Sequence, residues 1–115
     1  MSTMFDDRER AFEAKYALDE AMRFRAGARR DKLFAHWAAG RAGLPDAETT
    51  ALVDGVIHIS DRAGHDGAIL AYIGAALARH GAAATDAELA AALQHCAAQA
   101  RAELMAAPLD IDTTP

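Results

Sequence analysis

The 115-residue chain has too few cysteines for an internal disulfide and no apolar run long enough to span a membrane. It contains one cysteine, Cys96, and three prolines. A single cysteine excludes an internal disulfide and is typical of a reducing compartment. The longest uninterrupted apolar run, 68–78, has 11 residues, well below the roughly 18 that indicate a membrane span. The N-terminus is too charged for a secretory signal. We therefore expect a cytoplasmic protein with no membrane insertion.

Aromatic residues and positive charge are scarce beyond residue 37. Residues 3–37 contain six of the seven aromatics and eight of the twelve basic residues. The net charge is −5, with nine basic and seven acidic residues up to Arg41, and three and ten after it. An acidic chain disfavours nucleic-acid binding. A solvated helix face is our first interpretation of the dense basic cluster, which is Arg23, Arg25, Arg29, Arg30 and Lys32.

Residues 3–37 are predicted to form one long helix, because they contain no proline and no glycine before Gly27. Thr3 is the expected cap, with Asp6 returning a capping-box bond. One apolar stripe is expected to face a core: Leu18, Met22, Ala26, Leu33 and Trp37. A second stripe lies about a right angle away: Phe5, Phe12 and Tyr16. This second stripe either joins the core on a curved helix or belongs to projecting turns that bind a partner.

The next predicted helix covers 47–61. It follows a break at Pro45, with Asp46 as its N-cap. Its β-branched residues also suit a short strand, but no other segment could pair with that strand, so we interpret it as a helix. Its apolar positions are Leu52, Val53, Val56, Ile57 and Ile59.

Two further helices are predicted after a turn at Gly64. Asp66 is expected to cap the first of them and Gly81 to end it, while Thr85 and Glu88 form a capping box that opens the second. Pro108 closes the last helix. The expected inward positions are Ile69, Leu70, Ile73, Ala76, Leu77, Leu89, Leu93, Cys96, Ala100 and Leu104. The fold prediction is therefore an all-α, antiparallel four-helix bundle.

Three consecutive runs carry a family resemblance. They are FDDRERAFEAKY at 5–16, FRAGARRDKL at 24–33 and WAAGRAGL at 37–44. In this order they resemble the N-terminal half of the bacterial ATP synthase inhibitor zeta subunit family. The resemblance covers about the first two fifths of the chain, and beyond Pro45 only helix placement corresponds. The chain departs from the family pattern at Asp31, usually Asn, at 34–36, usually more aliphatic, and at 62–66, usually an acidic turn.

The resemblance implies a non-enzymatic inhibitor of ATP hydrolysis by the ATP synthase catalytic head, with its alpha, beta and gamma subunits as partners. It implies an inhibitory arm over 1–18 that projects from a bundle over 19–107 and inserts at a catalytic subunit interface to block rotation. Disorder of the free arm is one expected state, and 108–115 is an expected flexible tail. The implied partner-binding residues are Phe5, Asp6, Asp7, Arg8, Arg10, Phe12, Lys15 and Tyr16.

No arrangement of residues indicates catalysis, so we expect neither an enzyme nor a cofactor. Asp54, His58, Asp61 and His65 have spacings compatible with a divalent metal on one helix face. Gly64 is expected to end that helix before His65, which favours a solvated polar face. The alternative function is therefore a helical binding module for a divalent metal or an adenine nucleotide.

Overall fold

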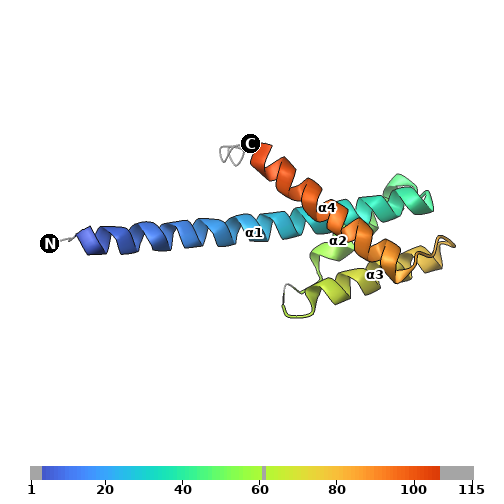
Figure 1. The fold of residues 1–115 in the computed structure, drawn as a ribbon. Coiled ribbons are helices and arrows are strands. Elements are labelled where there is room, and N and C mark those ends of the chain that lie inside the picture. The colour runs from blue at the N-terminus through green and yellow to red at the C-terminus, as the bar shows by residue number, and fades with distance from the viewer. Residues whose placement is uncertain (1–3, 61, 107–115) are drawn as a thin grey trace.

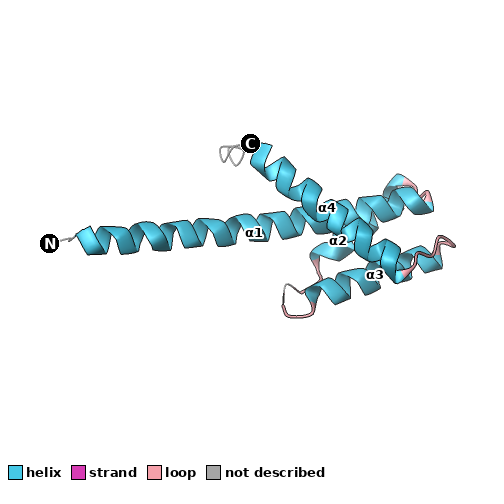
Figure 2. Ribbon diagram, viewed as in Figure 1, coloured by secondary structure: helices cyan, strands magenta, loops and turns pink. Residues whose placement is uncertain are grey.

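The structure, a computed structural model, describes residues 4–60 and 62–106. These residues form four helices: α1, Met4–Ala42; α2, Asp46–Ile57; α3, His65–Arg79; and α4, Asp86–Ala106. The described residues contain no strand (Figure 2). The all-α prediction is confirmed, and the segment left open between strand and helix is helical. The antiparallel arrangement stays a prediction. The predicted cap Thr3, Asp61 and the tail from Pro108 lie outside the described residues.

Helix α1 sets the long dimension of the molecule. Its 39 residues correspond to about 58 Å at the usual helical rise, and the molecule measures 66 × 33 × 22 Å along its principal axes. Figure 1 shows the N-terminal half of α1 extending away from the other helices, which gather around its C-terminal half. Every residue from 4 to 21 is exposed, and we call this part of α1 the exposed segment.

The hydrophobic core lies around the C-terminal half of α1. Phe34, Ile69, Ile73 and Leu77 are the largest fully buried side chains. Helix α1 adds three alanines that permit close helix approach: Ala35, Ala38 and Ala39. Further core residues come from α2 and α4: Leu52, Val56, Leu89, Leu93 and Cys96.

The predicted core face of α1 was wrong in phase. Leu18 is 47% exposed, and Met22, Ala26, Leu33 and Trp37 are only half-buried. The deepest stripe instead runs through Phe34, Ala35, Ala38 and Ala39. The prediction gave weight to apolar residues near the exposed segment, where no other helix covers α1. Only the packed half of the helix determines which face is buried.

The last two helices are separated as predicted. Gly81 has a φ of 71°, a left-handed conformation that favours glycine at a helix end. The Thr85 amide donates to Glu88 Oε1 at 3.0 Å, and the Glu88 amide donates to Thr85 Oγ1 at 3.1 Å. This reciprocal pair is the predicted capping box.

Two other predicted caps were wrong. Pro45 is the N-cap of α2, and Asp46 is already in the first turn, with no side-chain cap bond. Gly64 is the N-cap of α3, again without a side-chain bond. Asp66 lies inside that helix, where its carboxylate accepts a hydrogen bond from Arg30 of α1 at 2.8 Å. A charged partner from another helix thus takes the oxygen expected to bind local amides.

The C-terminal end of α1 is tied to the α3–α4 connection. Arg41 donates to the carbonyls of Ala82 and Ala83 at 3.1 and 3.0 Å and to Glu88 Oε2 at 3.1 Å. Its guanidinium also lies over the Trp37 ring, 5.8 Å from the centroid. These contacts secure the bundle at the end of α1 opposite the exposed segment.

Candidate functional site

The candidate partner-binding face is an apolar stripe on the exposed segment. At 100° per residue, Phe5, Phe12 and Tyr16 fall within an arc of about 40°. Their side chains are 82%, 73% and 62% exposed, respectively. The interpretation that this stripe joins the core is therefore wrong. Large apolar residues gathered on one exposed face are typical of an interaction surface.

Charged residues flank this stripe asymmetrically. By the same helical geometry, Arg8 and Lys15 lie about 60–80° to one side, and Glu9 and Glu13 lie about 40–80° to the other. The remaining predicted partner-binding residues, Asp6, Asp7 and Arg10, are also exposed but lie on the opposite half of the helix. The structure thus groups five of the eight predicted residues on one half of the segment: Phe5, Arg8, Phe12, Lys15 and Tyr16.

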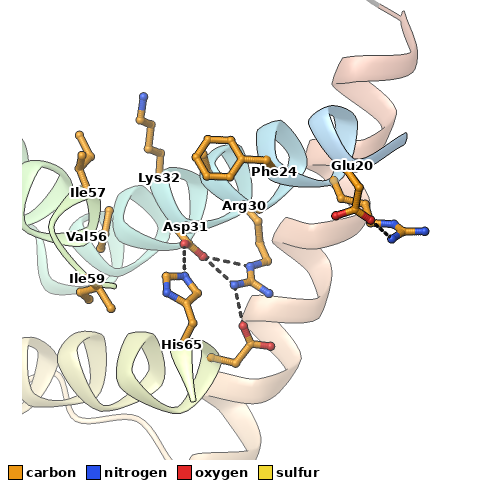
Figure 3. Close-up of a pocket in the computed structure, with 13 residues that line it drawn as sticks. Glu20, Phe24, Arg30, Asp31, Lys32, Val56, Ile57, Ile59 and His65 are labelled. Atoms are coloured by element: carbon orange, nitrogen blue, oxygen red, sulfur yellow. Dashed lines mark hydrogen bonds and ion pairs between the residues drawn. The ribbon is translucent and has the colours of Figure 1, made fainter. Parts of the chain in front are cut away.

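A second group of polar residues lies where α1 enters the bundle. We call it the junction cluster: Arg30, Asp31, His65 and Asp66. Figure 3 labels the first three of these residues. Asp31 is the first buried residue of α1, and it is the only charged side chain buried among the described residues. Arg30 donates to Asp31 Oδ1 from Nε at 3.0 Å and from Nη2 at 2.9 Å, and Nη2 also reaches Asp66 Oδ1 at 2.8 Å.

His65 completes the junction cluster from the first residue of α3. Its Nε2 lies 2.7 Å from Asp31 Oδ2, and its Nδ1 lies 2.7 Å from the Ser60 carbonyl oxygen. The ring therefore links α1 to the segment that precedes α3. The described residues leave no buried side-chain nitrogen or oxygen without a hydrogen-bond partner, as polar groups in this position require.

Electrostatics hold Arg30 charged. Burial acts to lower the pKa of its guanidinium, but hydrogen bonds to Asp66 and Asp31 and the charges of both carboxylates outweigh it, so the pKa is raised above its ordinary value. Next to it, Arg29 pairs with Glu103 of α4 at 2.5 Å. Hydrogen bonds from Arg29 and from Gln99 lower the pKa of Glu103. Arg30 therefore links α1 to α3, and its neighbour Arg29 links α1 to α4.

A pocket of about 590 Å³ lies beside the junction cluster. Apolar Phe24, Val56, Ile57 and Ile59 line it together with the cluster itself. In Figure 3, Phe24 and Lys32 point away from the Asp31–His65 contact. None of the eight predicted partner-binding residues lines this pocket.

The metal-compatible helix face, the less favoured interpretation of Asp54, His58, Asp61 and His65, does not form as one continuous face. Helix α2 ends at Ile57, so His58 follows the helix and His65 begins α3 instead of continuing the same face. Asp61 lies outside the described residues. Within 4–60 and 62–106, no group of three or more His, Cys, Asp or Glu side chains could hold a metal ion.

Sequence reasoning missed the junction cluster as a unit. Asp31 and His65 each stood out as a departure from the family pattern, but they are separated by 34 residues. No local spacing relates residues that far apart. The sequence offered no signal for this contact, because the burial of Asp31, which requires a partner, is known only from the structure.

These features define an all-α protein whose long first helix packs in a bundle by its C-terminal half and leaves its N-terminal half exposed. The model of one family, ATPase inhibitor subunit zeta, matches residues 1–103, and the chain belongs to this family. The match extends beyond the first two fifths, through α3 and into α4. Comparisons with curated proteins and with solved structures found no match. None of the described helices combines the length and apolar character needed to cross a membrane.

Proposed function

We propose that this protein inhibits ATP hydrolysis by the catalytic head of an ATP synthase. In this proposal the N-terminal part of α1, residues 1–18, inserts at a catalytic subunit interface and blocks rotation. The bundle, residues 19–107, stays outside the cleft, and the alpha, beta and gamma subunits are the partners. The family description, an ATPase inhibitor subunit, supports the activity. The exposed apolar stripe is the single observation that carries the assignment of the inserting element.

The stripe suits recognition of a helix in a groove. Phe5, Phe12 and Tyr16 recur on one face at spacings of seven and four residues, as anchors of a groove-bound helix do. Aromatic anchors of this kind each contribute about 2–4 kcal/mol when they are fully buried in a partner. Arg8 and Lys15, beside the stripe, pair with acidic groups that line the cleft.

The packing of α1 is compatible with a mechanism in which its N-terminal part inserts into the partner while the bundle stays outside. Among the residues from 4 onward that the structure describes, none before Asp31 is buried, so the described part of the inserting segment can enter a partner without opening the core. Burial of three exposed aromatics then adds apolar contact that the free protein lacks. Ordering costs stay low wherever the segment is already helical before binding.

The first test is ATP hydrolysis by the purified catalytic head of the cognate synthase. We expect inhibition by the full chain and none by a chain that begins at Asp19. Phe12→Ala is expected to weaken inhibition at least about tenfold. Phe24→Ala is the matched control, because Phe24 is 64% exposed on the same helix but lies about 100° from the stripe. Equal loss in both aromatic variants, or full inhibition by the shortened chain, contradicts insertion of the stripe.

A further inference from the structure

The His65 ring lies between two hydrogen-bond acceptors. Nδ1 is 2.7 Å from the carbonyl oxygen of Ser60. A backbone carbonyl only accepts, so Nδ1 must carry a proton in this contact. Nε2 is 2.7 Å from Oδ2 of Asp31. The protonation state of His65 therefore depends on whether Asp31 is ionised.

Asp31 carries a carboxyl group, which is ordinarily ionised at neutral pH. Arg30 donates two hydrogen bonds to Oδ1 of this carboxylate. An ionised carboxylate only accepts, so Nε2 of His65 must also carry a proton. Both contacts form together only when the ring is an imidazolium. In that state the cluster is electrically neutral, with Arg30 and His65 positive and Asp31 and Asp66 negative.

The described groups that line the adjoining pocket are mostly apolar or belong to α1. Helix α2 and the residues after it line the adjoining pocket with apolar side chains: Val56, Ile57 and Ile59. Helix α4 faces Arg30 with Cys96, whose pKa is raised by burial despite the opposing charge of Arg30, so the thiol is neutral. The charged residues of α1 that line the same pocket, besides the cluster, are Glu20, Arg23 and Lys32.

We propose that Asp31 and His65 form a proton-dependent lock that positions the start of α3 against α1 and thereby regulates inhibition. Loss of one ring proton as pH rises leaves two acceptors facing each other, either Nε2 and the Asp31 carboxylate or Nδ1 and the Ser60 carbonyl. The four side chains of the cluster then carry a net negative charge. One of the two contacts of the ring must then break. Asp31 is the first buried residue of α1, so the lock closes the bundle at the base of the exposed segment.

The lock would regulate the proposed inhibition, so its regulatory role rests on the proposed function. His65 acts through α1 as a positioning residue and does not touch the partner. With the lock closed, the exposed segment continues from a fixed joint, which lowers the ordering cost of insertion. With the lock open, that cost rises. Inhibition is therefore expected to be tighter at low pH than at high pH.

The charge state is tested first, in the free full-length protein. A long-range proton–nitrogen NMR spectrum of the imidazoles is expected to show two protonated nitrogens for His65 near neutral pH. One protonated nitrogen, or a His65 ring that titrates like that of His95, overturns the lock. His95 is the internal control because it is exposed on α4. This measurement needs no partner and no variant.

The Asp31→Asn variant tests whether the contact with His65 needs the second ring proton. The amide of an asparagine donates to a neutral Nε2 while its oxygen still accepts from Arg30, so this variant keeps the link without the second proton. We expect its melting temperature to vary less between about pH 6 and about pH 9 than that of the unaltered chain. His65→Gln is expected to lower the melting temperature at the low pH alone. Unchanged pH profiles in both variants overturn the lock.

Regulation is tested by inhibition of the cognate catalytic head at the same two pH values, each normalised to uninhibited hydrolysis. We expect the inhibitory concentration to rise several-fold with pH for the unaltered chain and to stay constant for Asp31→Asn. A constant value for both overturns the regulatory role. Absence of inhibition at either pH, with two protonated His65 nitrogens, overturns the proposed function and still supports the lock in the free protein.

Discussion

Gly55 and Tyr72 approach so closely that no side chain fits between them. A Cβ at Gly55 of α2 would lie 1.8 Å from the Tyr72 hydroxyl oxygen and 2.7 Å from the ring carbon that bears it. The same hydroxyl donates to the Leu52 carbonyl at 3.3 Å. Glycine has a low helix propensity and so weakens α2 at this position. The packing of α2 on α3 nevertheless requires a glycine here, because Tyr72 occupies the space of a side chain.

Gly55→Ala is therefore expected to destabilise the protein by about 1–2 kcal/mol, because the displaced tyrosine loses its hydrogen bond and its packing. Chemical denaturation measures the change. Gly27→Ala is the matched control, since a Cβ there meets nothing within 4 Å. It is expected to stabilise α1 by up to about 1 kcal/mol. Stabilisation by both substitutions would show that Tyr72 moves without cost.

Phe34→Ala is expected to lower the free energy of unfolding by about 3–5 kcal/mol. The Phe34 side chain is fully buried and its ring stacks on Trp37 at 5.6 Å, so truncation leaves a cavity at the centre of the bundle. Phe24→Ala, an exposed change in the same helix, should alter stability by less than about 0.5 kcal/mol. Similar losses in the two variants would mean that the core is located elsewhere.

The Thr85–Glu88 capping box predicts a loss of stability in acid. Hydrogen bonds from Thr85 and Arg41 lower the pKa of Glu88 from its ordinary 4.5. A lowered carboxyl pKa means that the stabilisation is complete above pH 4.5 and is lost as pH falls through the folded-state value. Thermal unfolding over this range should show a smaller pH dependence for Thr85→Ala than for the unaltered chain.

At neutral pH, Thr85→Ala is expected to cost about 1 kcal/mol through the lost cap. Thr50→Ala is a suitable control because Thr50 is exposed within α2. An identical acid profile for all three proteins would contradict the contribution of the capping box.

Charge reversal beside the apolar stripe tests the electrostatic part of the proposed insertion. Arg8→Glu and Lys15→Glu together are expected to slow inhibitor association and to weaken its dependence on ionic strength, because flanking charges steer encounter. The rate of onset of inhibition at several salt concentrations measures this. Arg10→Glu, on the opposite half of the helix, should have the smaller effect. A larger effect at Arg10 would place the contact face on the other side of α1.

Much of the fold was predictable because its determinants are local. The uninterrupted helix formers before Gly27, the left-handed Gly81 and the reciprocal bonds of Thr85 and Glu88 involve neighbours in sequence. Propensity and capping act over one or two turns and so can be deduced without a fold. The limits of this reasoning appear at Asp66, where a plausible local cap is displaced by Arg30 from another helix.

The sequence by itself determined four helical segments, most of their boundaries and the grouping of Phe5, Phe12 and Tyr16 on one face of α1. Only the tertiary structure decided that this face is exposed, that Phe34 and not Leu18 belongs to the core, and that Asp31 meets His65. The reason is physical. Helical periodicity fixes which residues share a face, but burial and ion pairing depend on which helices pack there, and that is a property of the whole chain.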